Sequence, residues 1–112
     1  MKQLKIKCWI EADGEKYYGP GPHELLKQIQ KEGSLSKAAV KMHMSYKKAW
    51  AMAQRLNQFS EEALVILKKG GQHGGGAEVS PYALEIMKEY EELQLKVRQQ
   101  IDQKDKSLKI LK

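Results

Sequence analysis

The chain has 112 residues, 41% of them hydrophobic, and a formal net charge of +6 at pH 7. This length suits one small domain, and no apolar run is long enough to cross a bilayer or to serve as a signal peptide. A single cysteine, Cys8, excludes an internal disulfide and fits the reducing cytoplasm, where we expect the protein to act without a membrane partner.

The first element expected is a strand, because apolar and polar residues alternate over residues 4–11. Its inward face would consist of Leu4, Ile6, Cys8 and Ile10. The dipeptide Asp13-Gly14 predicts a turn, and the sequence GPGP at residues 19–22 predicts a stiff connector. The N-terminal part of the chain therefore reads as a half-buried strand that leads into helices.

Three short helices are expected next. Pro22 suits the first position of a helix with Leu25, Leu26 and Ile29 on its apolar stripe, and Gly33 would end that helix. Ser34 and Ser45 are good N-caps for two more helices. The apolar stripes of these two helices are Leu35, Ala38, Ala39 and Met42, then Ala49, Met52, Ala53 and Leu56. Such a short break between them, with small residues at the contact, predicts a helix-turn-helix.

A hairpin follows the helices. Residues 63–69 and 77–79 have strand character, and five glycines lie within residues 68–79 between two lysines and the second strand. The order of helix, helix, helix and hairpin is that of a winged helix-turn-helix, a mainly α fold with a small β component. We therefore predict a DNA-binding domain over residues 1–80.

Residues 81–112 predict a long C-terminal helix that serves as a dimerisation element and tail. After Pro81 the chain lacks proline and glycine as far as about residue 107 and is rich in helix formers. A heptad-like seam is formed by Ile86, Tyr90, Leu93 and Val97. Its 4-3-4 spacing is typical of residues that meet a second helix, so we expect a homodimer.

The positive charge lies in the middle of the chain, as expected for a surface that meets a polyanion. Residues 33–76 hold seven basic and two acidic side chains. In the predicted recognition helix, 45–59, the outward residues and those of its first turn are Ser45, Tyr46, Lys47, Lys48, Trp50 and Gln54. Such residues contact base edges and phosphates in a major groove. The alternatives are that the lysines only solvate a surface and that Trp50 belongs to the core.

Two further groups could contact phosphates. Ser34, Ser36 and Lys37 open the preceding helix, whose free N–H groups favour an anion. In the predicted wing, 68–79, the lysines Lys68 and Lys69 lie at the base, and Gln72 and His73 lie at the apex. The glycines would let this wing approach a DNA backbone closely, whereas the alternative is a surface loop without a function.

No pattern indicates catalysis, a metal or a cofactor. The glycine run is not followed by the Gly-Lys-Ser/Thr of a nucleotide P-loop. His23, His43 and His73 lie in separate predicted elements, and no catalytic Ser-His-Asp arrangement or pair of carboxylates is found. We therefore expect a protein that is not an enzyme and that has neither a metal site nor a cofactor.

Two motifs together resemble the N-terminal DNA-binding domain of the ModE family of molybdate-responsive transcriptional regulators. The S-Y-K-x-A-W signature of that family reads here as residues 45–50, SYKKAW, and the glycine-rich wing with its following helix matches residues 70–98. The similarity covers residues 4 to about 98, and the helix pair alone also resembles LysR-type regulators.

The resemblance implies a winged helix that binds double-stranded DNA as a dimer, with Ser45, Tyr46, Lys47 and Lys48 in the major groove and Gln72 and His73 in the wing. Family members continue into oxyanion-binding domains that sense molybdate, whereas this chain ends at Lys112, so DNA binding is expected of it and molybdate binding is not. The leading hypothesis is a dimeric, sequence-specific regulator. The alternatives are a nonspecific architectural DNA-binding protein and a protein-interaction adaptor.

Overall fold

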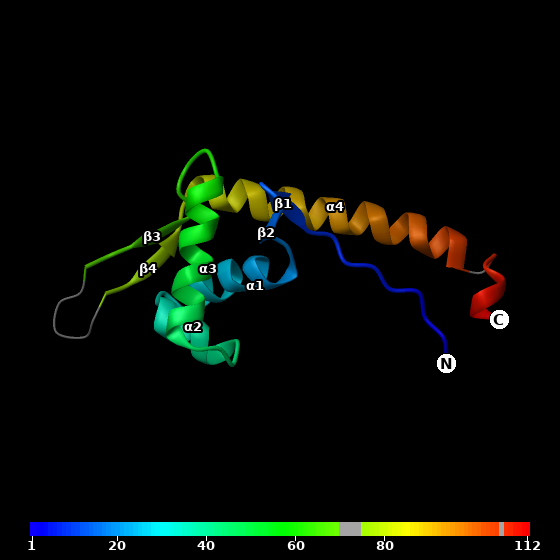
Figure 1. Cartoon of the computed structure of the whole chain (residues 1–112), viewed down its shortest axis with the longest axis horizontal. Helices are drawn as coiled ribbons and strands as arrows, with labels where there is room; N and C mark the ends of the chain where they lie inside the picture. The colour runs from blue at the N-terminus through cyan, green and yellow to red at the C-terminus, as the bar shows by residue number, and fades with distance from the viewer. Residues whose placement is uncertain (70–74, 106) are drawn as a thin grey trace.

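The computed structural model describes residues 1–69, 75–105 and 107–112. It confirms a mainly α winged helix fold, 59 × 30 × 24 Å in extent, with two small antiparallel sheets. The elements in chain order are β1 (Ile10–Ala12), β2 (Glu15–Tyr18), α1 (Pro20–Glu32), α2 (Leu35–Lys41), α3 (Tyr46–Phe59), β3 (Val65–Leu67), β4 (Ala77–Val79), α4 (Pro81–Asp105) and a 3-10 turn, η1 (Lys109–Leu111). Helix α4 follows the long axis, and β3 and β4 project at the end opposite the C-terminus (Figure 1).

Local capping signals set the bounds of the three short helices. Gly33 ends α1 with a φ of 71°, and its N–H donates to Ile29 O at 2.8 Å. The Oγ atoms of Ser34 and Ser45 cap α2 and α3, so both predicted N-caps are confirmed. Helix α1 begins at Pro20, two residues before the predicted Pro22. Both prolines fit because the first turn of a helix needs no backbone donors.

The core lies where α1, α2 and α3 meet. Leu25, Leu26 and Ile29 of α1 are fully buried, as is Leu56 of α3. The buried sides of α2 and α3 include four alanines, Ala38, Ala39, Ala49 and Ala53, each exposed by 2% or less. Side chains of one methyl group let two helices approach closely, which confirms the predicted helix-turn-helix.

The predicted strand over residues 4–11 is wrong except at its end. Residues 1–9 have no regular secondary structure, and β1 begins only at Ile10. Leu4, Ile6 and Ile10 are 36%, 55% and 47% exposed, and only Cys8 is partly buried. The alternation of apolar and polar residues is typical of a strand, but a strand also needs a partner. Within the described ranges no second strand pairs with residues 1–9.

The predicted turn at Asp13-Gly14 is confirmed, and it joins β1 to β2. Both residues have positive φ values, 52° and 81°, which a two-residue hairpin turn of type I′ requires. The hairpin places Tyr17 and Tyr18 of β2 against the helices, and Tyr18 is only 2% exposed. The chain thus enters α1 from a buried aromatic residue.

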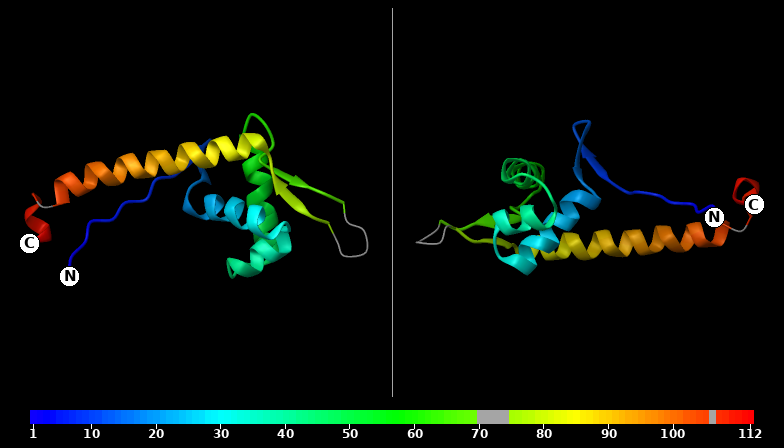
Figure 2. Two further views of the ribbon diagram at one scale, coloured as in Figure 1. Left: turned by 180° about the vertical axis from the view of Figure 1, so that it is seen from behind. Right: turned by 90° about the horizontal axis from the view of Figure 1, so that it is seen from below.

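Helix α4 is joined to the rest of the chain by a polar cluster in which Tyr18 and His23 are buried and Glu91 is half exposed. The hydroxyl of Tyr18 lies 2.7 Å from Nδ1 of His23, and Nε2 of His23 lies 3.0 Å from Oε1 of Glu91 on α4. The Tyr90 hydroxyl donates to the backbone oxygen of Cys8 at 2.7 Å, so α4 also holds the N-terminal segment (Figure 2). The division at residue 80 stays a prediction, although buried Ala83, Met87 and Tyr90 extend the core into α4. None of the described helices is long and apolar enough to cross a membrane.

This cluster predicts a loss of stability at alkaline pH. Burial of the Tyr18 hydroxyl is the main cause that raises the pKa of Tyr18 above its ordinary value of 10.0. The nearby Tyr90, Glu91 and Tyr17 raise it further by charge repulsion. As the pH rises, the Tyr18 phenol loses its proton at a lower pH in the unfolded chain than in the folded one. The free energy of unfolding should therefore be unaffected by this group below pH 10.0 and should fall as the pH rises above it. Urea unfolding on both sides of this pH should show the fall.

The matched variant is Tyr18→Phe, which has no ionisable phenol at this position. Its stability should depend less on pH above 10.0, although Tyr90, whose pKa is also raised by burial, keeps part of the dependence. An alkaline slope as steep as that of the wild type would show that Tyr18 is not its source.

Candidate nucleic-acid interface

The outer face of α3 carries large and basic side chains. Tyr46 is 53% and Trp50 44% exposed, and Lys47 and Lys48 are exposed beside them. Gln54, one turn further along, is half-buried. Trp50 is therefore a surface residue and not a core residue, while the opposite side of α3 holds the buried stripe. In an amphipathic helix of this kind, the apolar stripe faces the core and the polar face is left to solvent.

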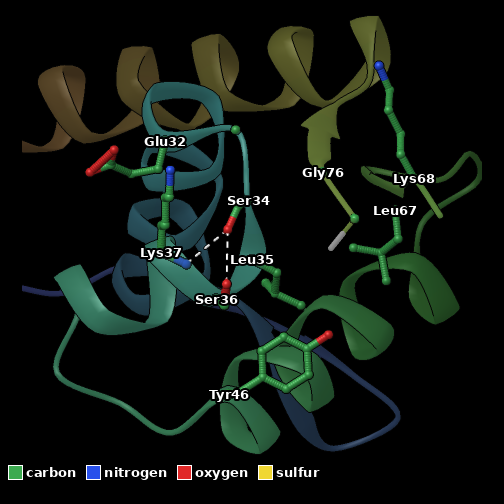
Figure 3. A pocket seen from close by; sticks show the side chains of 11 residues that line it. Glu32, Ser34, Leu35, Ser36, Lys37, Tyr46, Leu67, Lys68 and Gly76 are labelled. Atoms are coloured by element: carbon green, nitrogen blue, oxygen red, sulfur yellow. Dashed lines mark hydrogen bonds between the residues drawn. The ribbon is translucent and has the colours of Figure 1, made fainter. Parts of the chain in front are cut away.

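A hollow lies between the start of α2, the start of α3 and the base of the wing, β3–β4. Its volume is about 520 Å³. Figure 3 shows Ser34, Ser36 and Tyr46 around it, with Leu67 and Gly76 across from them. The lining residues are Glu32, Gly33, Ser34, Leu35, Ser36, Lys37, Tyr46, Leu67, Lys68, Gly75 and Gly76. The structure thus brings three predicted groups, the starts of both helices and the wing base, to one concave surface.

The serines at the start of α2 form a small hydrogen-bonded unit. The Oγ of Ser34 accepts the N–H of Lys37 at 3.0 Å and lies 3.1 Å from the Oγ of Ser36. Both serines therefore have internal partners, but the Ser36 side chain is exposed and retains capacity for a further hydrogen bond. Lys37 is exposed beside them.

The base of the wing is fixed to the junction of α1 and α2 by a close backbone contact. Ala77 N–H donates to Gly33 O at 2.9 Å, and Lys68 N–H donates to Gly76 O at 2.8 Å. A Cβ added at Gly76 would lie 3.3 Å from Gly33 O, which is tighter than usual van der Waals contact. One glycine of the run therefore serves a close approach of two backbones. Gly70, Gly71 and Gly74 lie outside the described residues.

The start of α3 carries two exposed positive charges, those of Lys47 and Lys48. Among the described residues, no carboxylate lies within salt-bridge distance of Lys47 or Lys48. Lys68 instead pairs with Glu78 across the hairpin at 3.1 Å, and both side chains are at least half exposed. Such an exposed pair is worth about 0–1 kcal/mol, so Lys68 can exchange its carboxylate for another anion at little cost.

Two residues of α3 outside the predicted set hold this helix against the rest of the chain. Asn57, on the last turn of α3, hydrogen-bonds through its side-chain amide to the backbone of Leu64 and Val65 at the start of β3. Arg55 is exposed on α3 and donates to Lys16 O at 3.5 Å. Sequence reasoning overlooked Asn57 because its partners are backbone atoms that only the folded chain brings to it. The exposed Arg55 could have been found from the helical period.

Two of the predicted wing residues, Gln72 and His73, lie outside the described residues. Lys69 lies at the edge of the described part and is exposed. The groups that the structure does bring together are therefore the first turns of α2 and α3, the base of the wing and Lys68. A metal site is not among them: the described ranges contain no group of three His, Cys, Asp or Glu side chains that could hold an ion.

The predicted dimer seam on α4 does not lie on one exposed face. Tyr90 is 4% exposed and belongs to the core of its own chain, where its ring centroid lies 5.0 Å from that of Tyr18. Its assignment to a dimer interface is corrected accordingly. Ile86 also packs against this core, whereas Leu93 is 45% exposed and Val97 half-buried. A contact of Leu93 and Val97 with a second chain stays a prediction.

No protein-family model matches the chain. Three similar curated proteins are the transcriptional regulator ModE of Haemophilus influenzae, the DNA-binding transcriptional dual regulator ModE of Escherichia coli and the molybdenum-pterin-binding protein MopB of Rhodobacter capsulatus. The first is 33% identical over 94 residues, 84% of this chain and 37% of the relative. The second is 34% identical over 89 residues, 80% of this chain and 34% of the relative. The third is 33% identical over 86 residues, 77% of this chain and 32% of the relative, so the chain spans about a third of each.

The cap of α3 predicts a stability effect that can be separated from charge. Replacing Ser45 with Ala removes the acceptor of the Lys48 N–H, now at 3.1 Å, and should lower the free energy of unfolding by about 1 kcal/mol. Ser45→Asp retains an acceptor and puts a negative charge at the positive end of the helix dipole, so its stability should stay near that of the wild type. Urea unfolding measures both, and an equal loss in the two variants would contradict the capping role.

Proposed function

The chain carries a ModE-like DNA-binding domain, and from this premise we propose that it is a cytoplasmic, dimeric transcriptional regulator that reads a specific sequence in double-stranded DNA. The observation that carries the proposal is the exposed start of α3, with Tyr46, Lys47 and Lys48 free of carboxylate partners among the described residues and a wing held beside them. The name of the Escherichia coli relative, a DNA-binding regulator, supports the same assignment.

In this proposal α3 enters the major groove with its first turn toward the base edges. Lysine donates to O6 and N7 of guanine, and the hydroxyls of Ser45 and Tyr46 bond bases or phosphates. Trp50 and Gln54 follow one and two turns later, so they reach the groove wall and the neighbouring sugar-phosphate. The lack of salt bridges at Lys47 and Lys48 supports this role, because no internal partner must be given up on binding.

The hollow beside α3 would receive the DNA backbone. Ser36 and Lys37 border it from α2, and Lys68 borders it from the wing. Their hydroxyl and ammonium groups suit phosphate oxygens, which fix the register of a protein on DNA without reading the sequence. Lys69, Gln72 and His73 would extend this contact along the wing. The wing therefore contributes affinity, and α3 contributes the sequence preference.

The experiment that tests this function is selection from randomised duplex DNA with the purified protein at near-physiological salt. Enrichment of an inverted repeat is the expected result, because two copies related by a twofold axis read two half-sites. Retention of DNA without enrichment would favour a nonspecific architectural protein, with binding that depends steeply on salt. No retention at all would contradict DNA binding and favour an adaptor for other proteins.

Lys47→Ala should separate base reading from phosphate binding. If Lys47 contacts a base, its loss should weaken binding to the selected site by about 1–3 kcal/mol and leave binding to random DNA much less changed. Titrations on both kinds of duplex measure the difference. Lys88→Ala, which removes an exposed lysine from α4, is the matched control and should bind both duplexes like the wild type. Equal losses of Lys47→Ala on the two duplexes would assign Lys47 to a phosphate.

Leu93→Glu should weaken the proposed dimer. Leu93 is 45% exposed on α4, and an ionised carboxylate cannot be buried against a second chain without a large desolvation cost. Sedimentation velocity over a range of concentrations should show more monomer than in the wild type. The control Gln94→Glu adds the same charge at the next, exposed position, and it should leave the assembly unchanged. A Leu93→Glu protein that remains as dimeric as the wild type would remove Leu93 from the interface.

A further inference from the structure

We propose that Asn57 is a positioning residue that sets the wing at a fixed angle to α3, so that both can contact one DNA duplex at the same time. This inference rests on the proposed function. It concerns a residue whose described hydrogen bonds go to backbone atoms of the same chain.

The side-chain amide of Asn57 can make four hydrogen bonds, and three of them go to the backbone of Leu64 and Val65 at the start of β3. Oδ1 accepts the N–H groups of Leu64 and Val65 at 2.8 and 3.0 Å, and Nδ2 donates to Val65 O at 2.9 Å. Two N–H groups face one atom and a carbonyl faces the other, so the orientation of the amide is fixed by its partners. A flipped amide would place a donor against two donors.

The hydrogen bonds of Asn57 bridge the segment between α3 and β3, which has no regular secondary structure. Residues 60–64 between α3 and β3 form neither helix nor strand. The wing itself is a sheet of two three-residue strands, and such a small sheet is marginally stable alone. The orientation of the wing must therefore come from its attachments.

In the described part of the chain, three sets of hydrogen bonds hold the base of the wing, each from a different element, and buried Val65 and Ala77 pack into the core beside them. Gly33 O, after α1, accepts the N–H of Ala77 on β4. Ser80 Oγ, which caps α4, donates to Ala63 O at 2.7 Å, and Ser80 N–H donates to Leu64 O at 3.0 Å. Among the described residues, Asn57 supplies the side-chain hydrogen bonds that join β3 to α3. It is therefore the attachment that sets the wing against the helix proposed to read bases.

The three bonds suggest two variants with different chemistry. Asn57→Ala removes all three hydrogen bonds and leaves Leu64 and Val65 without their side-chain partner. Asn57→Asp keeps one oxygen for the two N–H groups but places a second oxygen, without a proton, against Val65 O. Gln58→Ala removes an exposed amide at the next position and is the matched control. None of these changes removes a side chain assigned to DNA.

The test combines binding to the selected DNA site with a measurement on the free protein. In Asn57→Ala the slope of log K against log salt should fall by about 0.9 for each phosphate that the wing no longer reaches, while the selected sequence stays preferred over random DNA. Amide hydrogen exchange at Leu64 and Val65 should become faster in Asn57→Ala and stay slow in Gln58→Ala. Asn57→Asp should keep slow exchange at these amides but share part of the lower salt slope, and it also serves if Asn57→Ala does not fold.

A residue with only a structural role would give a different result. Lower stability with an unchanged salt slope in both Asn57 variants would overturn the proposal. If wild-type protein retains no DNA, the proposed function fails, and the positioning role is then decided by residual dipolar couplings of the free proteins. Rotation of the amide vectors of β3 and β4 against those of α3 in Asn57→Ala supports the role, and an unchanged orientation overturns it.

Discussion

The interface depends on the close approach of α2 and α3. Ala38 and Ala39 of α2 and Ala49 and Ala53 of α3 are almost fully buried, and such small side chains allow two helix backbones to approach closely. Larger side chains at such a contact overpack it, at a cost of about 1–3 kcal/mol. The first turn of α2, the first turn of α3 and, through the Gly33 carbonyl, the base of the wing all take their positions from this contact.

The lysines of the chain differ in how they are balanced. Lys47 and Lys48 have no salt-bridge partner among the described residues, whereas Lys68 and Lys41 face Glu78 and Glu32. The unpaired lysines hold mobile counterions that a phosphate backbone can displace, and the release of these ions favours binding at low salt. The paired lysines moderate the charge of the surface until a stronger anion competes for them.

Local signals in the sequence predicted the helices better than the N-terminal strand. Ser34, Ser45 and Gly33 set helix ends because a cap involves only neighbouring residues. The alternation over residues 4–11 indicates which residues would lie on each face of a strand. It does not indicate whether a second strand is present to pair with them. A strand also needs partners, and partners come from the tertiary fold.

The same limit explains Tyr90 and Asn57 in the candidate site. Heptad-like spacing placed Tyr90 on an apolar face of α4 but could not tell whether that face meets its own chain or a second one. The role of Asn57 depends on two backbone segments that the fold brings together, and no spacing rule marks it. By contrast, the exposed residues at the start of α3 followed directly from the helical period.

The bond between Tyr90 and the N-terminal segment has an evolutionary consequence. Its acceptor is the backbone oxygen of Cys8, which every amino acid at that position would supply. The identity of residue 8 can therefore change without loss of this bond, although the Cys8 side chain also packs against the core. The attachment of the first residues to α4 depends instead on the phenol of Tyr90, which is the donor of the bond.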